Sequence, residues 1–286
     1  MKRWALALFV ALSLAWVACV RTDGFHPTLI EGPLFTEAAP LPSSDVEAIL
    51  SQPFHYLSKG RQSFVFESAD GKYVLKFFNQ KYLQNPWYTF LVEKKEKAKR
   101  ALRRHYYENS YKIAFQELGD EILYLHLGPS GPLPKVNITD KANREFTLDL
   151  AQLPFVLQKR GIPFYSALDD IYAKEGIEGL KREIDSFLFA ISLRISKGIA
   201  DGDHDVEHNW GYVDGHIFHL DPGRLYYDEH LIENSRLKQE WYRATHNFAK
   251  WLRIYYPEAA NYLAKREPAC YKNQSQELLL LNGPLD

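Results

Sequence analysis

The chain has 286 residues, enough for one large domain or for two lobes with a proper hydrophobic core. Its formal net charge is -1, so no overall basic field argues for nucleic acid, and we expect no nucleic-acid partner. Because Cys19 and Cys270 are the only cysteines, cysteine-rich zinc sites and cysteine catalysis are excluded.

Residues 1–21 resemble a signal peptide or a membrane anchor. Two basic residues precede an apolar run that ends at Arg21, which is typical of a secretory signal. Cys19 stands where a bacterial lipoprotein signal carries its acylated cysteine, although Trp16 replaces the usual leucine. The run is also near the lower length limit for a spanning helix. We expect membrane association through this segment, by a lipid on Cys19 or by an uncleaved anchor, with simple cleavage as a third option and the side of the membrane open.

Residues 22–53 are rich in proline, which interrupts every periodic pattern, and we expect a tether with one short helix at residues 44–50. Three short strands are predicted next, at residues 55–57, 64–66 and 73–78. Lys76 stands on the third strand and shares a face with apolar neighbours. Such a lysine either extends its ammonium to water at an edge or pairs with anions inside a cleft.

Helical and extended patterns continue along the chain. Residues 87–118 read as a long helix whose crowded lysines and arginines form a solvated face. Apolar spacing predicts further helices at 177–198, 236–256 and 257–265, followed by a loosely ordered tail. Additional strands are predicted at residues 122–127, 135–139, 146–150 and 155–158.

An acidic stretch follows the helix that ends near Gly198. Within it, Asp214-Gly215 joins two short strands as a tight hairpin, which holds Asn209 at its entry close to Asp221 at its exit. So many carboxylates cost too much desolvation to form an ordinary core. Carboxylate and amide oxygens presented together suit Mg²⁺, which completes its shell with phosphates and water.

Asp203, Asn209 and Asp221-Pro222-Gly223 resemble the catalytic loop and the metal-binding triplet of the protein-kinase-like phosphotransferases. Two features depart from that pattern. The usual spacing would place His204 at the position of the catalytic aspartate, so Asp203 needs one extra residue in the loop and Asp205 one fewer. Pro222 also replaces the usual phenylalanine of the triplet.

The resemblance implies an α+β, two-lobe kinase-like fold, similar to bacterial lipopolysaccharide-core and sugar kinases. A small β-rich N-lobe at 54–160 would bind nucleotide, a reduced helical C-lobe at 161–265 would carry the catalytic loop and metal site, and 266–286 would be a tail. It also implies ATP and Mg²⁺ as cofactors and transfer to an unknown hydroxyl of a protein, sugar or lipid.

The resemblance assigns roles to individual residues. Asp203 would orient or deprotonate the acceptor hydroxyl, with Asp205 as its substitute, while Asp221 and Asn209 would hold metal. Lys76 would hold the α- and β-phosphates of the nucleotide, and a loop with Gly60 and Ser63 would cover them. A glutamate would pair with Lys76; Glu96, Glu108 and Glu117 qualify by type, and we expect Glu108 because of its distance before the next strand.

Three other interpretations remain open. A zinc or iron hydrolase site is suggested by Asp221 and the nearby histidines, His204, His208, His216 and His219. A catalytically inactive pseudokinase is suggested by the replaced glycines of the loop and by Pro222. Nucleotidyl or glutamyl transfer, which some kinase-like bacterial proteins perform, is not separated from phosphorylation by any residue of this sequence.

Overall fold

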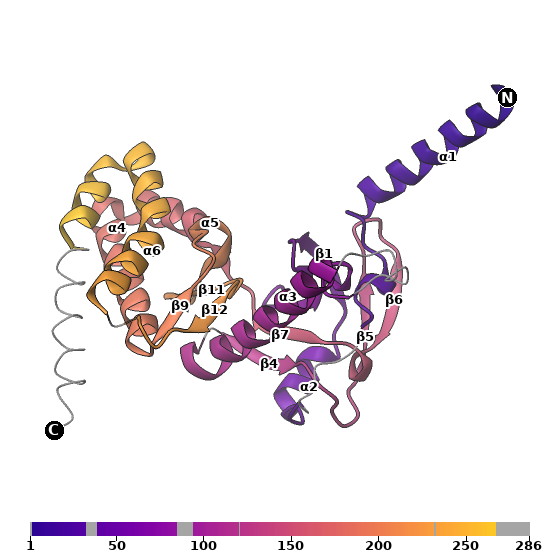
Figure 1. The fold of residues 1–286 in the computed structure, drawn as a ribbon, viewed down its shortest axis with the longest axis horizontal. Coiled ribbons are helices and arrows are strands. Elements are labelled where there is room, and N and C mark those ends of the chain that lie inside the picture. Colours follow the sequence, from indigo (N-terminus) through magenta and orange to yellow (C-terminus); the bar gives the residue numbers. More distant parts are fainter. Residues whose placement is uncertain (1, 33–38, 85–93, 120, 232, 267–286) are drawn as a thin grey trace. The chain divides into compact units, whose positions relative to one another are not determined.

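The computed structural model describes residues 2–32, 39–84, 94–119, 121–231 and 233–266 (Figure 1). The chain forms two compact units, one made of residues 1–105 and 122–160 and the other of residues 106–121 and 161–286. The first is rich in strands and the second is mostly helical. The predicted α+β class is therefore confirmed, and the order of elements fits a two-lobe kinase-like fold.

The first unit is built on a seven-stranded sheet with the strand order β4-β7-β3-β2-β1-β5-β6. All its adjacent strands are antiparallel except β1 and β5, which are parallel. The predicted strands are all present: β1 Phe54–Lys59, β2 Ser63–Ser68, β3 Tyr73–Phe78, β4 Ile122–His126, β5 Lys135–Thr139, β6 Glu145–Asp149 and β7 Phe155–Lys159. Short 3₁₀ turns lie at η1 Pro27–Leu29, η2 Gln80–Tyr82 and η5 Leu150–Gln152.

The expectation that residues 22–53 form a tether is wrong for the described part of this segment. Phe25 is 2% exposed, and its ring packs edge-on against Phe64 and Phe66 with centroid distances of 5.1 and 5.2 Å. The apolar side chains that this segment adds to the core of the sheet are Phe25, Ile30, Val46 and Leu50. Prolines prevent a periodic pattern in this segment. An irregular stretch such as residues 22–32, which we call the strap, can still bury single side chains, and a pattern search does not detect this.

In the described part of the first unit, three α-helices lie wholly or partly within it. The predicted short helix is present as α2 Ser44–Leu50, with the Ser43 hydroxyl accepting the N–H of Val46 as its cap. α1 Lys2–Arg21 precedes the strap, and α3 Lys94–Ile113 runs on into a π-helical turn, η4 Ala114–Leu118. The predicted start of the α3 region at residue 87 lies outside the described residues. No helix in the described ranges combines the length and the apolar character that crossing a membrane requires.

The second unit packs two long helices around an aromatic core. α4 Phe164–Ser196 starts earlier than predicted, because a first helical segment precedes Gly176, whose backbone (φ 64°, ψ -152°) interrupts the helix. α6 Asn234–Tyr255 and the helix at 257–266 follow the predicted pattern, whereas the tail from 267 lies outside the described residues. Phe187 of α4 and Phe248 of α6 meet in the core, with ring centroids 5.0 Å apart.

Short strands and one helical turn carry the acidic stretch. They are β9 Ile199–Asp201, α5 Val206–Asn209, β10 Trp210–Val213, β11 His216–His219 and β12 Leu225–Tyr227, and the earlier strand β8 Ile162–Pro163 pairs with β10. The predicted hairpin is confirmed, because β10 and β11 pair antiparallel around Asp214 and Gly215. Both turn residues have positive φ, 50° and 83°, as a two-residue turn of type I′ requires.

Candidate active site

The short pairing of β9 with β12 brings the start of the acidic loop beside the segment that follows Asp221. Leu225 lies opposite Asp201 in this pairing. The Gly202 N–H donates to the Arg224 carbonyl at 3.0 Å. Asp203 is therefore positioned next to the Asp221-Pro222-Gly223 triplet by backbone hydrogen bonds.

Asp203, Asn209 and Asp221 converge around Gly223. The Asn209 Nδ2 donates to the Asp203 carbonyl at 3.3 Å, and the Asp221 N–H donates to the Asn209 carbonyl at 3.3 Å. A Cβ added to Gly223 would lie 3.2 Å from the Asp203 Cβ and 3.5 Å from the Asn209 Nδ2. Since Gly223 also has a φ of 57°, both its conformation and its surroundings require glycine. Three residues predicted for the site are thus neighbours.

The oxygen atoms at this point suit a small hard cation. The Asn209 amide nitrogen is directed at Asp203, so the amide oxygen is the end left for a ligand. Two groups of the described residues donate to the Asp221 carboxylate: Tyr111 Oη at 3.4 Å and the Gly223 N–H at 3.3 Å. Both donate to Oδ1, so Oδ2 is the oxygen left to bind a cation. One carboxylate and one amide, completed by phosphate and water oxygens, match the preference of Mg²⁺.

Asp203 and Asp205 differ in what their side chains do. Asp205 caps the single turn α5, because its Oδ1 accepts the His208 N–H at 3.3 Å and its Oδ2 lies 2.9 Å from His208 Nδ1. For Asp203, the backbone N–H donates to Asp201 Oδ1 at 2.8 Å, and the residue lies outside α5. The Asp205 carboxylate is therefore occupied as a helix cap, whereas Asp203 is not a cap of this turn.

A buried ion pair supports the loop from beneath. Arg194 of α4 and Glu240 of α6, 1% and 5% exposed at their side chains, meet at 2.7 Å. Glu240 Oε1 accepts the Asp201 N–H at 3.0 Å, and Arg194 Nη1 donates to the Ile199 carbonyl at 2.9 Å. The pair thus holds both ends of β9 and, through β9, the start of the acidic loop.

Burial and charge shift the pKa values of the carboxyl groups here in opposite directions. Burial alone would raise the pKa of Glu240, but His204, Arg194 and the Asp201 N–H outweigh it and lower the pKa to about 2. The His204 Nε2 lies 3.8 Å from Glu240 Oε2, an ion-pair distance rather than a hydrogen bond. Burial raises the pKa of Asp201, although Arg194 opposes this. Glu240 is therefore the charged partner of Arg194 at neutral pH.

Sequence reasoning missed two residues of α3 that contact Asp221 and the strand β12 that follows it. Tyr111, 1% exposed, donates to Asp221, and the next residue back, the fully buried Ser110, donates to the Leu225 carbonyl at 3.2 Å. Burial raises the pKa of Tyr111 well above its usual value, and the Asp221 charge adds to this, so the hydroxyl remains a donor. The sequence signal that could have indicated these contacts is the presence of a serine and a tyrosine on the apolar face of an otherwise basic helix.

The nucleotide-binding residues predicted in the first unit are Gly60, Ser63 and Lys76. They lie in the turn after β1, on β2 and on β3. Lys76 is 7% exposed on β3, between Val65 of β2 and Val156 of β7. The Gly60 N–H donates to the Ser63 carbonyl at 2.9 Å, so this amide closes a hairpin turn, and Ser63 is buried in β2. A Cβ at Gly60 would meet no atom closer than 3.8 Å, so glycine is not sterically required there. Contact of this loop with phosphate stays a prediction.

The glutamate expected to pair with Lys76 has a partner of its own in the second unit. Glu108 Oε1 lies 2.8 Å from Lys112 Nζ, one helical turn further along α3. A contact between Lys76 and Glu108 would join the two units, and it stays a prediction.

The histidines of the acidic stretch have separate partners. His208 contacts Asp205, His204 faces Glu240, and the His219 ring packs on Trp210 with centroids 4.0 Å apart. His216 is exposed. In the ranges that the structure covers, no three residues among His, Cys, Asp and Glu are grouped to hold a metal ion. The zinc or iron site considered from the sequence is not assembled by these residues.

Comparison with known proteins gives a remote structural likeness. No protein-family model and no curated protein sequence matches the chain. Solved structures of WbdD match at 16% identity. A crystal structure has a TM-score of 0.38, and the match covers 79% of this chain and 46% of that one. A complex with the kinase inhibitor LY294002 has a TM-score of 0.39, with 77% of this chain and 45% of that one covered. A third, of what is described as the bifunctional kinase-methyltransferase WbdD, has a TM-score of 0.36 and covers 76% and 43%. The chain spans less than half the length of these proteins, and at such values the likeness fixes neither a family nor an activity.

Proposed function

We propose that the chain is an ATP- and Mg²⁺-dependent phosphotransferase of the kinase-like type, acting on a hydroxyl group of a protein, sugar or lipid. The observation that carries the proposal is the convergence of Asp203, Asn209 and Asp221 around Gly223. Phosphoryl transfer needs a carboxylate and an amide that hold a cation, here Asp221 and Asn209. It also needs a second carboxylate near the acceptor, here Asp203, which is not used as a helix cap.

In the proposed reaction the protein supplies position and charge. Asp221 Oδ2 and the Asn209 amide oxygen would hold Mg²⁺, which when bound neutralises the charge of the phosphate oxygens. Asp203 would accept the hydrogen bond of the acceptor hydroxyl and direct its oxygen at the γ-phosphate. Little covalent chemistry is asked of the residues, so correct placement is the main contribution.

The first unit would hold the nucleotide. Lys76 would contact the α- and β-phosphates, Glu108 would orient its ammonium, and the Gly60–Ser63 turn would lie over the phosphates. Residues 1–21 would attach the protein to a membrane, through a lipid on the exposed Cys19 or as an uncleaved anchor.

Ligand-dependent stability of the full chain tests the proposal. ATP should raise the melting temperature only when Mg²⁺ is present, because the phosphates and Asp221 share the cation. Asp221→Asn should abolish the increase. Asp214→Asn, the same change in the exposed turn between β10 and β11, should leave it intact, since asparagine tolerates the positive φ there.

Other outcomes would favour the alternatives. ATP and Mg²⁺ binding without transfer to any protein, sugar or lipid acceptor would favour a pseudokinase. Stabilisation by Zn²⁺ alone, with no effect of nucleotide, would contradict the kinase-like proposal. Transfer of AMP or glutamate to protein would retain the nucleotide site but replace the reaction.

A further inference from the structure

A pocket of about 540 Å³ lies between the second half of α4 and the hairpin of β10 and β11. Its volume is in the range of ordinary ligand pockets. It is separate from the site described above, because Asp203, Asn209 and Asp221 do not line it.

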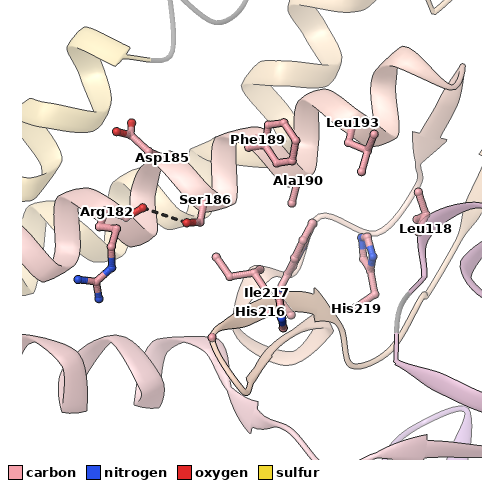
Figure 2. A pocket seen from close by; sticks show the side chains of 12 residues that line it. Leu118, Arg182, Asp185, Ser186, Phe189, Ala190, Leu193, His216, Ile217 and His219 are labelled. Carbon is pink, nitrogen blue, oxygen red and sulfur yellow. Dashed lines mark hydrogen bonds between the residues drawn. The ribbon is translucent and has the colours of Figure 1, made fainter.

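The pocket has an apolar wall that is open to solvent. In Figure 2, Phe189, Ala190 and Leu193 of α4 lie on one side, and Ile217 and His219 of β11 lie on the other. Phe189 is 69% exposed and Leu193 is 41% exposed, although they are neighbours four residues apart on one helix face. An exposed apolar pair beside a cavity is typical of an interaction surface.

The described part of the chain ends at the rim of this pocket. Arg266 is its last residue, and its Nε lies 2.8 Å from Oδ1 of Asp185, which lines the pocket. The Tyr262 hydroxyl donates to the other oxygen of the same carboxylate at 2.7 Å. Arg266, the residue to which the remaining chain is joined, therefore lies beside α4 at the edge of the pocket.

That segment carries an apolar run without any charge. Leu278, Leu279, Leu280 and Leu281 are consecutive, and the sequence between Arg266 and this run is mostly polar. Residues 267–278 can span up to ~40 Å when extended. The distance to be covered along α4, from residue 185 to residue 193, is only about 12 Å. The run can therefore reach every part of the pocket.

We propose that Leu278–Leu281 docks into this pocket of its own chain, with leucine side chains against Phe189, Leu193 and Ile217. Tethering at Arg266 raises the local concentration of the run to the millimolar range, so a weak apolar contact is enough for occupancy. The proposal is independent of phosphotransfer, because it uses none of the residues assigned to that reaction.

Cross-linking in the full chain tests the docking. In a background of Cys19→Ser and Cys270→Ser, the variant Leu281→Cys with Phe189→Cys is treated with a short bis-maleimide. The matched control is Leu281→Cys with Ile254→Cys, since Ile254 is similarly exposed, at 64%, and lies on α6 only a few residues before the helix that ends at Arg266. A tail that moves freely would reach either position. A docked tail should link to position 189 roughly tenfold faster than to position 254, the ratio expected when about one leucine is buried.

Two results would overturn the proposal. Equal linking at positions 189 and 254 would show an undocked tail, and linking between chains would show that a second copy fills the pocket.

Hydrogen exchange gives a second measurement that leaves the pocket residues native. Leu279→Asp with Leu280→Asp should increase exchange at residues 186–193 and 216–219. Gln274→Asp with Gln276→Asp adds the same charge without touching the leucines and should not. Unchanged exchange in both pairs would contradict docking.

Discussion

The Tyr111 hydroxyl donates a hydrogen bond to Asp221 Oδ1 at 3.4 Å, across 110 residues of sequence. Tyr111 lies near the end of α3, which also contacts Leu225 of β12 through Ser110. This tyrosine contacts the Asp221 carboxylate from the neighbouring helix. The orientation of Asp221 thus depends on a residue of α3.

Tyr111→Phe should weaken the response to Mg²⁺. Loss of one buried hydrogen bond should lower the free energy of unfolding by about 1 kcal/mol. Because a carboxylate ligand loses its orienting partner, the Mg²⁺ concentration needed for ATP-dependent stabilisation should rise roughly tenfold. Urea unfolding and Mg²⁺ titration measure the two effects. Tyr172→Phe, at a residue that is 43% exposed, is the control, and an equal Mg²⁺ midpoint in both variants would contradict the assigned role.

Gly223→Ala should abolish nucleotide binding and should also lower the free energy of unfolding. The positive φ alone costs roughly 1–3 kcal/mol for a residue with a side chain. Gly198→Ala carries the same kind of strain at a φ of 69° but meets no atom within 4 Å, so it isolates that cost. The extra loss in Gly223→Ala then measures the collision with Asp203 and Asn209. If both variants keep Mg²⁺-dependent binding of ATP, the crowding around Gly223 does not matter for the site.

Asp203→Asn should block transfer while leaving nucleotide binding intact. Removing a positioned proton acceptor typically lowers the rate by about 10²- to 10⁴-fold. Asp205→Asn should have little effect, because asparagine also caps helices and Asp205 serves as the cap of α5. Transfer from γ-labelled ATP to pooled protein, sugar and lipid acceptors provides the assay. Loss of activity in Asp205→Asn with retention in Asp203→Asn would reverse the assignment of the two residues.

Glu240→Gln should change how stability depends on pH. The pKa of Glu240 is lowered to about 2 in the folded protein, below its ordinary value of 4.5. Its contribution is therefore fully present above about pH 4.5 and is lost as the pH falls toward 2. At pH 7 the variant should lose roughly 3–5 kcal/mol, because Arg194 is left buried without its charged partner.

Urea unfolding at pH 7, 4.5 and 3 measures this difference. The gap between the wild type and Glu240→Gln should shrink at the lowest pH. The raised pKa of Asp201 acts with the opposite sign but is present in both proteins. Glu258→Gln, at an exposed glutamate, is the control, and a constant gap at all three pH values would contradict the linkage.

Local patterns predicted much of the fold. The strands around Asp70-Gly71, the hairpin at Asp214-Gly215 and the helix after Gly176 each follow from turn residues and apolar spacing within a few residues. The proximity of Asn209 to Asp221 was also predictable, because one hairpin joins them.

Long-range contacts could not be predicted in this way. Tyr111 and Asp221 are linked by tertiary packing alone, and so are Arg194 and Glu240. The apolar spacing of the sequence does not predict such a pair, since its two residues lie in separate parts of the sequence. The apolar spacing predicts a helix only from residue 177, so the first helical segment of α4, which precedes the break at Gly176, was not predicted.

The strap formed by residues 22–32 limits how recombinant fragments of this protein should be designed. A fragment that begins at the first strand, Phe54, would leave the rings of Phe64 and Phe66 without Phe25 and would be prone to aggregate. The upstream limit is set by Asp23, whose carboxylate binds Tyr56 and Lys141. A cut just before Cys19 would keep all of these contacts, so loss of residues 1–18 is compatible with an intact sheet.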